Sequence, residues 1–72
     1  MLVLRRKPGE RIFLQLPGGE WIAVTVQDVQ ASGVGVGFQA PHTVYIMREE
    51  NLTEQQRDEA IASIREYEGA RR

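Results

Sequence analysis

The stretch that decides the fold is RIFLQLPGGEWIAVTVQDV, residues 11–29. Residues 11–16 and 21–29 are rich in β-branched, aromatic and other apolar side chains, which favour strands. Pro17-Gly18-Gly19 stands between them as a strong turn signal. We therefore predict two strands joined as a β-hairpin. The second strand alternates, with Ile22, Val24 and Val26 on one face and Trp21, Ala23, Thr25 and Gln27 on the other.

A further strand is expected on the N-terminal side of this hairpin. Residues 2–7 alternate, with Leu2, Leu4 and Arg6 on one face. Pro8-Gly9-Glu10 then forms a turn, because proline fixes φ and glycine supplies a permissive position. The chain therefore reaches the hairpin from a first short strand.

Two more strands are expected on the C-terminal side, after a turn at Ala31-Ser32-Gly33. Residues 34–39 alternate apolar side chains with Gly35 and Gly37, and glycine in a strand often marks a bend or a close backbone approach. Ala40-Pro41-His42 separates this strand from residues 43–48. The two faces of the last strand are formed by Val44, Ile46 and Arg48 on one side and by Tyr45 and Met47 on the other.

After residue 50 the hydrophobic period changes from two to about 3.6, as in a helix. Thr53 and Gln56 form a capping box at its start, and Gly69 is a natural stop. The apolar stripe of this helix consists of Ala60, Ile61, Ile64 and Tyr67. The expected fold is mostly β, with five short antiparallel strands plus a C-terminal α-helix per chain. Residues 1–50 form the five-stranded β domain, and residues 51–72 form the helix and tail of the same single domain.

The size of the chain predicts a partner. A chain of 72 residues buries only about 60% of its unfolded surface, so a lone core is marginal. The absence of cysteine and the single histidine, His42, exclude disulfides and clusters of Cys or His metal ligands. Exposed strand edges also invite pairing. We therefore predict an intertwined, strand-sharing homodimer.

Charge is unevenly distributed along the chain, although the net charge is only −1. Residues 1–11 carry four basic side chains against Glu10, whereas residues 49–68 carry seven acids against two arginines. A basic edge fits a local anion-binding site, and solvation of the surface is the simpler alternative. No apolar run approaches the roughly 20 residues of a membrane span, and the N-terminus lacks a signal-peptide pattern. A cytoplasmic protein without membrane association is expected.

The sequence lacks the groups that catalysis needs, so we expect no enzyme, no metal and no cofactor. Ser32 and Ser63 have only His42 as a candidate base, and nothing nearby supports a triad. The adjacent Glu49 and Glu50 would point to opposite faces of a strand. His42 is expected as an exposed loop residue, and Trp21 as a partly exposed packing residue.

Three segments together resemble the carbon storage regulator family (CsrA/RsmA) of bacterial post-transcriptional regulators. They are MLVLxRxxGE at residues 1–10, GFQAP at residues 37–41 and REE at residues 48–50. The resemblance covers residues 1–52 and implies an intertwined homodimer, in which the first strand of one chain lies beside the fifth strand of the other. It also implies binding of mRNA at GGA-containing hairpin loops or single strands, typically near ribosome-binding sites. Small RNAs with many GGA motifs sequester such proteins, and in some bacteria a flagellar assembly protein antagonises them.

The resemblance also implies an RNA-binding site in which arginines hold phosphate or guanine and aliphatic groups cover the bases. The first strand supplies Leu4, Arg5 and Arg6. The partner chain supplies Ala40, Pro41, Val44, Ile46, Met47 and Arg48. The chain departs from the family at Gly35, where arginine is usual, at Met47, where histidine is common, and in a longer loop at Leu16–Glu20. These departures keep a second interpretation open, a protein-interaction module of the same fold with weakened or lost RNA binding.

Overall fold

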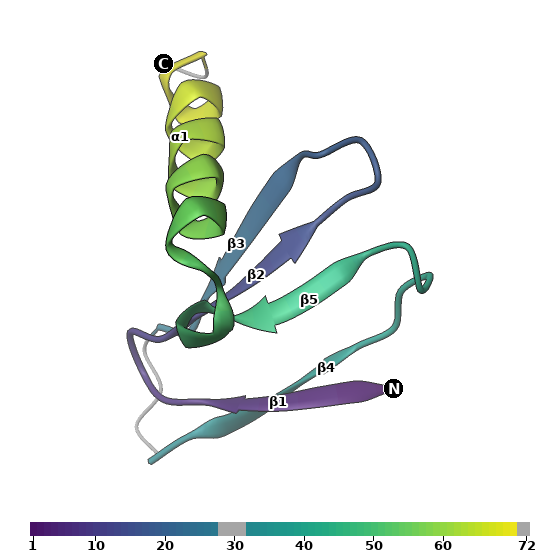
Figure 1. Cartoon of the computed structure of the whole chain (residues 1–72). Helices are drawn as coiled ribbons and strands as arrows, with labels where there is room; N and C mark the ends of the chain where they lie inside the picture. The colour runs from purple at the N-terminus through teal and green to yellow at the C-terminus, as the bar shows by residue number, and fades with distance from the viewer. Residues whose placement is uncertain (28–31, 71–72) are drawn as a thin grey trace.

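The structure is a computed structural model that describes residues 1–27 and 32–70, with the backbone alone for residues 66–70. Figure 1 shows five short strands followed by one long helix. The elements are β1 (Leu2–Arg6), β2 (Arg11–Gln15), β3 (Trp21–Thr25), β4 (Val34–Phe38), β5 (Tyr45–Arg48), the 3₁₀ turn η1 (Glu49–Asn51) and α1 (Glu54–Ala70). The predicted mostly β fold with a C-terminal helix is confirmed.

Several element ends differ from the prediction. β1, β2 and β4 each end one residue earlier than predicted, and β5 begins at Tyr45 and not at residue 43. The third strand ends at Thr25, whereas residues 21–29 were predicted, and Asp28, Val29 and the predicted turn residue Ala31 lie outside the described residues. The helix continues through Ala70, so the prediction of a stop at Gly69 is wrong by one residue. A glycine weakens a helix but is tolerated in its final turn, where the backbone carbonyls lack partners in any case.

The strands form two antiparallel sheets, in the orders β3–β2–β5 and β1–β4. The predicted hairpin is confirmed, since Ile12 pairs with Val24 and Leu14 with Ile22. At its turn, Gly19 has a φ of +90°, and its N–H donates to the carbonyl of Leu16 at 2.9 Å. Glycine adopts this backbone conformation without the steric cost of a Cβ atom. The turn residues therefore set the register of the larger sheet.

One face of the larger sheet forms the core under α1. Phe13 is fully buried, and Trp21 packs against it edge-on, with ring centroids 6.3 Å apart. Ala60 of α1 joins this cluster, and Ile64 packs at its margin. Trp21 is only 8% exposed, so its predicted partial exposure is wrong. The helix covers the ring because α1 packs on β3, a tertiary contact that the local pattern around Trp21 does not contain.

The start of α1 follows the predicted capping box. The Gln56 N–H donates to Thr53 Oγ1 at 3.1 Å, and the Thr53 N–H donates to Gln56 Oε1 at 2.9 Å. Two of the N–H groups left free at the start of a helix are thereby satisfied. The cap fixes the start of α1 at Glu54, and Ala60, further along the helix, then lies in the core.

The close approach predicted for the glycines of β4 is also confirmed. Gly37 lies opposite Val3 in the β1–β4 register, and a Cβ atom at Gly37 would collide with Met1 Sδ. A Cβ atom at Gly35 would lie 3.3 Å from Val3 Cγ1. The missing side chains therefore leave room for the start of the chain against β4. Among the described helices, none is long and apolar enough to cross a membrane.

Candidate functional site

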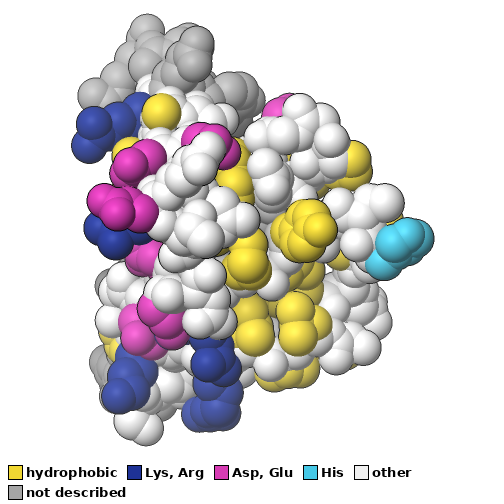
Figure 2. Space-filling view, viewed as in Figure 1, with side chains coloured by type: hydrophobic (Ala, Val, Ile, Leu, Met, Phe, Trp, Pro, Cys, Tyr) yellow, Lys and Arg dark blue, Asp and Glu magenta, His cyan; other side chains and the backbone are white. Residues whose placement is uncertain are grey.

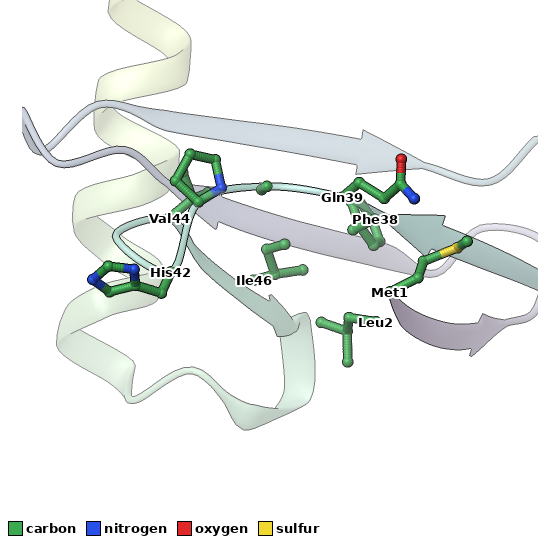
Figure 3. A pocket seen from close by; sticks show the side chains of 9 residues that line it. Met1, Leu2, Phe38, Gln39, His42, Val44 and Ile46 are labelled. Atoms are coloured by element: carbon green, nitrogen blue, oxygen red, sulfur yellow. The ribbon is translucent and has the colours of Figure 1, made fainter.

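An open groove of about 470 Å³ lies where the start of β1 meets the loop between β4 and β5. Four of the predicted site residues line it: Ala40, Pro41, Val44 and Ile46. In Figure 3, Leu2 and Ile46 lie in the middle of the groove, with His42 and Val44 toward one end and Met1, Phe38 and Gln39 toward the other. Most of the lining residues are apolar, while polar atoms contribute slightly more than half of the exposed lining. This mixed surface suits groups with flat apolar faces and polar edges, such as nucleobases.

The sequence prediction missed five residues of this groove: Met1, Leu2, Phe38, Gln39 and His42. The alternation of the strands contained part of the signal, because it placed Leu2 on the same face as Leu4. His42 is exposed, as predicted, and it also lines the groove. Its position there depends on how the loop after β4 folds back, which no periodic pattern encodes.

Arg48 ends β5 and lies opposite Ile12 in the ladder with β2. Its Nε is buried and has no hydrogen-bond partner. Among the described residues, its guanidinium makes no hydrogen bond and no ion pair. Buried donors are normally satisfied, so an unpaired one calls for a ligand, an ion or water. Arg48 shares a strand face with Ile46, which places a free guanidinium on the groove side of β5.

Arg6 is in the opposite situation, since it is only 4% exposed and is bound by its own chain. Its Nη1 donates to Glu50 Oε1 at 2.8 Å and to the Arg11 carbonyl at 2.9 Å. Its Nη2 donates to Glu50 Oε2 at 2.6 Å, and Glu10 Oε2 lies 3.4 Å away. Its Nε donates to the Arg5 carbonyl at 3.2 Å. Direct contact of Arg6 with RNA stays a prediction.

A second ion pair stands beside the first. Arg11 Nε donates to Glu49 Oε1 at 3.1 Å, and Arg11 Nη2 donates to Glu49 Oε2. Adjacent glutamates at the start of η1 thus bind the arginines that end β1 and begin β2. We call these two pairs, Arg6–Glu50 and Arg11–Glu49, the double clamp. They line a charged cleft of about 320 Å³ together with Gly9, Glu10 and Arg57.

The double clamp makes stability depend on pH. Hydrogen bonds from Arg11 and Arg6 hold the pKa of the Glu49 and Glu50 carboxyls below the ordinary 4.5. A carboxyl whose pKa is lower in the folded state binds fewer protons there than in the unfolded chain. Its contribution is therefore complete above the unfolded pKa and is lost as the pH falls through the folded pKa.

We therefore expect the unfolding temperature to fall as the pH is lowered from about 5 to about 3. Glu49→Gln should flatten this dependence, because Glu49 is the less exposed of the two clamp carboxyls. Thermal unfolding followed by circular dichroism at several pH values checks the slope. Glu54→Gln, which removes an exposed acid without an ion pair in the described part of the chain, should keep the wild-type slope. Equal slopes for Glu49→Gln and wild type would contradict this account of the clamp.

The other predicted residues lie on different faces. Leu4 is half-buried in β1, while Arg5 is exposed and lies opposite Gly35. Met47 pairs with Phe13 and thus shares the core face of the larger sheet. The structure brings Ala40, Pro41, Val44 and Ile46 together but places Met47 on the other side of β5. The roles of Leu4, Arg5 and Met47 in binding stay predictions.

The segments that carry the two halves of the predicted site meet within one chain, although partly through residues outside the predicted set, Leu2 and Glu50. Leu2 and Ile46 line the same groove, and Arg6 binds Glu50, two residues after Arg48. Arg48 also helps to lower the pKa of Glu50. The resemblance implies that these halves come from two chains, and that arrangement stays a prediction. In Figure 2, apolar side chains form the middle of this face, with charged side chains on one side and the histidine on the other.

Comparisons with known proteins agree on one family. The model of CsrA, described as a global regulator protein family, matches residues 1–57. The translational regulator CsrA of Syntrophomonas wolfei is 39% identical over 69 residues, which cover 96% of this chain and 84% of that protein. The translational regulator CsrA of Treponema pallidum is 38% identical over 63 residues, covering 88% and 81% of the two chains. That of Thermotoga petrophila is 43% identical over 61 residues, covering 85% and 68%. No solved structure gives a significant match.

Proposed function

Because this chain belongs to the CsrA family, we propose that it is a translational regulator that acts by binding mRNA, and that it is not an enzyme. The observation that carries this proposal is the groove lined by apolar residues, with Arg48 on the same face of β5 as the lining residue Ile46. Arg48 offers a guanidinium without a partner among the described residues, and its Nε is buried. Apolar surface is offered by Ile46 of β5 and by Pro41 and Val44 of the loop before it, all of which line the groove. Together they supply one charged, planar donor and several surfaces for bases.

The RNA element that suits this site is a looped-out or single-stranded GGA. Single-stranded bases expose both their faces and their hydrogen-bonding edges, which paired bases in an A-form helix do not. A guanidinium matches the O6 and N7 acceptors of guanine with two parallel N–H donors. Backbone groups next to Ala40 and Pro41, both exposed, can read the remaining edges. Binding near a ribosome-binding site then blocks translation by occupying the message.

The active form proposed here is a homodimer with two such sites. Met1, Leu2 and Val3 are large apolar residues that stay exposed on a single chain, next to the free edge of β1. Exposed apolar strand edges favour pairing with another chain. Two linked sites would let one RNA with two GGA elements bind more tightly than either element alone. By the same reasoning, small RNAs with repeated GGA motifs would sequester the dimer, and a flagellar assembly protein is a candidate antagonist.

A matched pair of RNA hairpins tests the proposed specificity. One hairpin carries GGA in its loop, and the other carries the same stem with the loop changed to CCA. We expect the GGA hairpin to bind at least about tenfold more tightly, because each mismatched base contact costs roughly 1–3 kcal/mol. Fluorescence anisotropy at a fixed, stated salt concentration measures both affinities.

The result also separates the two candidate functions. Equal affinity for the two hairpins would contradict sequence-specific recognition of GGA. No measurable RNA binding by a folded dimer would favour the alternative, a protein-interaction module of the same fold. Gly35 motivates that alternative, because β4 has no basic side chain at this position, which lies opposite Arg5 of β1.

A further inference from the structure

We propose that Arg6 and Glu50 serve RNA binding as positioning residues, whose ion pair fixes the turn after β5 and thereby orients Arg48. This inference rests on the proposed function. It assigns Arg6 a different role from that of a direct contact, and it gives Glu50 a role where the resemblance assigned none.

The guanidinium of Arg6 already donates four hydrogen bonds within its own chain. A guanidinium has five N–H donors. In Arg6, Nε is taken by the Arg5 carbonyl, Nη1 by the Arg11 carbonyl and Glu50, and Nη2 by Glu50 with Glu10 at 3.4 Å. The side chain is also 4% exposed. An RNA phosphate or base would have to displace one of these acceptors and open the burial around them.

The η1 turn connects Glu50 to Arg48. Arg48 has extended backbone angles, φ −64° and ψ 146°, and the η1 turn begins at the next residue. The Leu52 N–H closes this turn on the Glu49 carbonyl at 3.1 Å. Glu49 and Glu50 are then held by arginines from two other strand ends. The backbone that follows Arg48 is thus held in place by the ion pairs of two consecutive residues, Glu49 and Glu50.

The charge of Glu50 has the same sign as that of RNA. Glu50 is 55% exposed and lies near Arg48, so its carboxylate adds a negative charge beside a surface proposed to bind a polyanion. If Glu50 had no positioning role, neutralising it would leave RNA affinity unchanged or raise it, because one repulsion would be removed. Removal of a positioning group would lower the affinity instead. The direction of the change therefore separates the two roles.

The decisive variant is Glu50→Gln, which keeps the size of the side chain and removes its charge. We expect it to weaken binding of the GGA hairpin at least about fivefold, and Arg6→Ala to weaken it similarly. The double variant should lose no more than the worse single variant, since both act through the same pair. Glu54→Gln is the matched control, because it removes an exposed acid just after η1 without breaking an ion pair in the described part of the chain.

Further measurements distinguish a loss of RNA binding from a loss of folding. Circular dichroism and gel filtration establish that each variant is folded and has the wild-type oligomeric state. The ¹⁵N–¹H resonance of Arg48 Nε reports its environment directly, and we expect it to move in Glu50→Gln but not in Glu54→Gln. Should Glu50→Gln fail to fold, Arg6→Lys replaces it. Lysine keeps the charge but has three N–H donors on one nitrogen, so it cannot replace the four hydrogen bonds that the planar guanidinium of Arg6 makes to Glu50 and to the Arg5 and Arg11 carbonyls. Binding should therefore fall although the charge is unchanged.

The outcomes are distinguishable from failure of the proposed function. If wild type does not prefer the GGA hairpin, the proposed function fails. If wild type prefers it and folded Glu50→Gln binds as tightly or more tightly, the positioning role is wrong while the function stands. Full binding by folded Arg6→Lys would likewise overturn the positioning role, because it would show that the charge alone is enough.

Discussion

Arg48→Ala is expected to weaken binding of a GGA hairpin by roughly 1–3 kcal/mol, or about 5- to 150-fold in Kd. The physical reason is the loss of the guanidinium that stands beside the groove without a partner in the described part of the chain. No ion pair within residues 1–27 and 32–65 is broken by this change, so the fold should be retained. Fluorescence anisotropy with the GGA hairpin measures the loss.

Arg65→Ala is the matched control for this prediction. Arg65 is an exposed arginine of α1, and its removal changes the net charge by the same amount. We expect a change below about twofold, since a distant exposed charge is largely screened at physiological salt. If folded Arg48→Ala binds like wild type, or if Arg65→Ala loses as much affinity, Arg48 is not the recognition residue.

Phe13→Ala should have the largest effect on stability, lowering the free energy of unfolding by about 3–5 kcal/mol. Phe13 is completely buried between Trp21 and Ala60, so the change leaves a cavity under α1. A chain of this length has a total stability of about 4–11 kcal/mol, so the change is expected to remove from about a quarter of it to all of it. Urea unfolding at matched protein concentration measures the change, because association adds to the apparent stability.

Ile22→Ala serves as the control for Phe13→Ala. Ile22 lies in the same sheet, on the face away from Phe13, and is 44% exposed. Its truncation should cost less than about 1 kcal/mol. A loss at Ile22 as large as the loss at Phe13 would place the stabilising core on the wrong face of the larger sheet.

Local features of the fold could be predicted because they depend on residues close together in sequence. The capping box needs only Thr53 and Gln56, which are three positions apart in the sequence. The hairpin turn needs only Gly19 and its neighbours. The close packing at Gly37 followed from the absence of a side chain, although the neighbour that fills the space, Met1, was not identified. These predictions succeeded because short-range geometry determines them.

Tertiary contacts decided the features that sequence patterns missed. Trp21 is buried because a helix almost 40 residues later covers it. Arg6 is bound within its own chain because Glu50, 44 positions away, reaches it from η1. Four of the residues that the resemblance implied, Ala40, Pro41, Val44 and Ile46, line the groove, but the resemblance treated Arg6 and Arg48 alike. Their surroundings differ, since the guanidinium of Arg6 donates four hydrogen bonds and that of Arg48 has no partner among the described residues.

The most direct test of the central claim is to map where a GGA hairpin binds on the ¹⁵N-labelled protein by NMR titration. The claim predicts that the largest amide shifts fall at Ala40, Val44, Ile46 and Arg48 and at the start of β1. It also predicts that the exposed face of α1 stays unchanged. Shifts concentrated on α1, or the same pattern with the CCA hairpin, would contradict it.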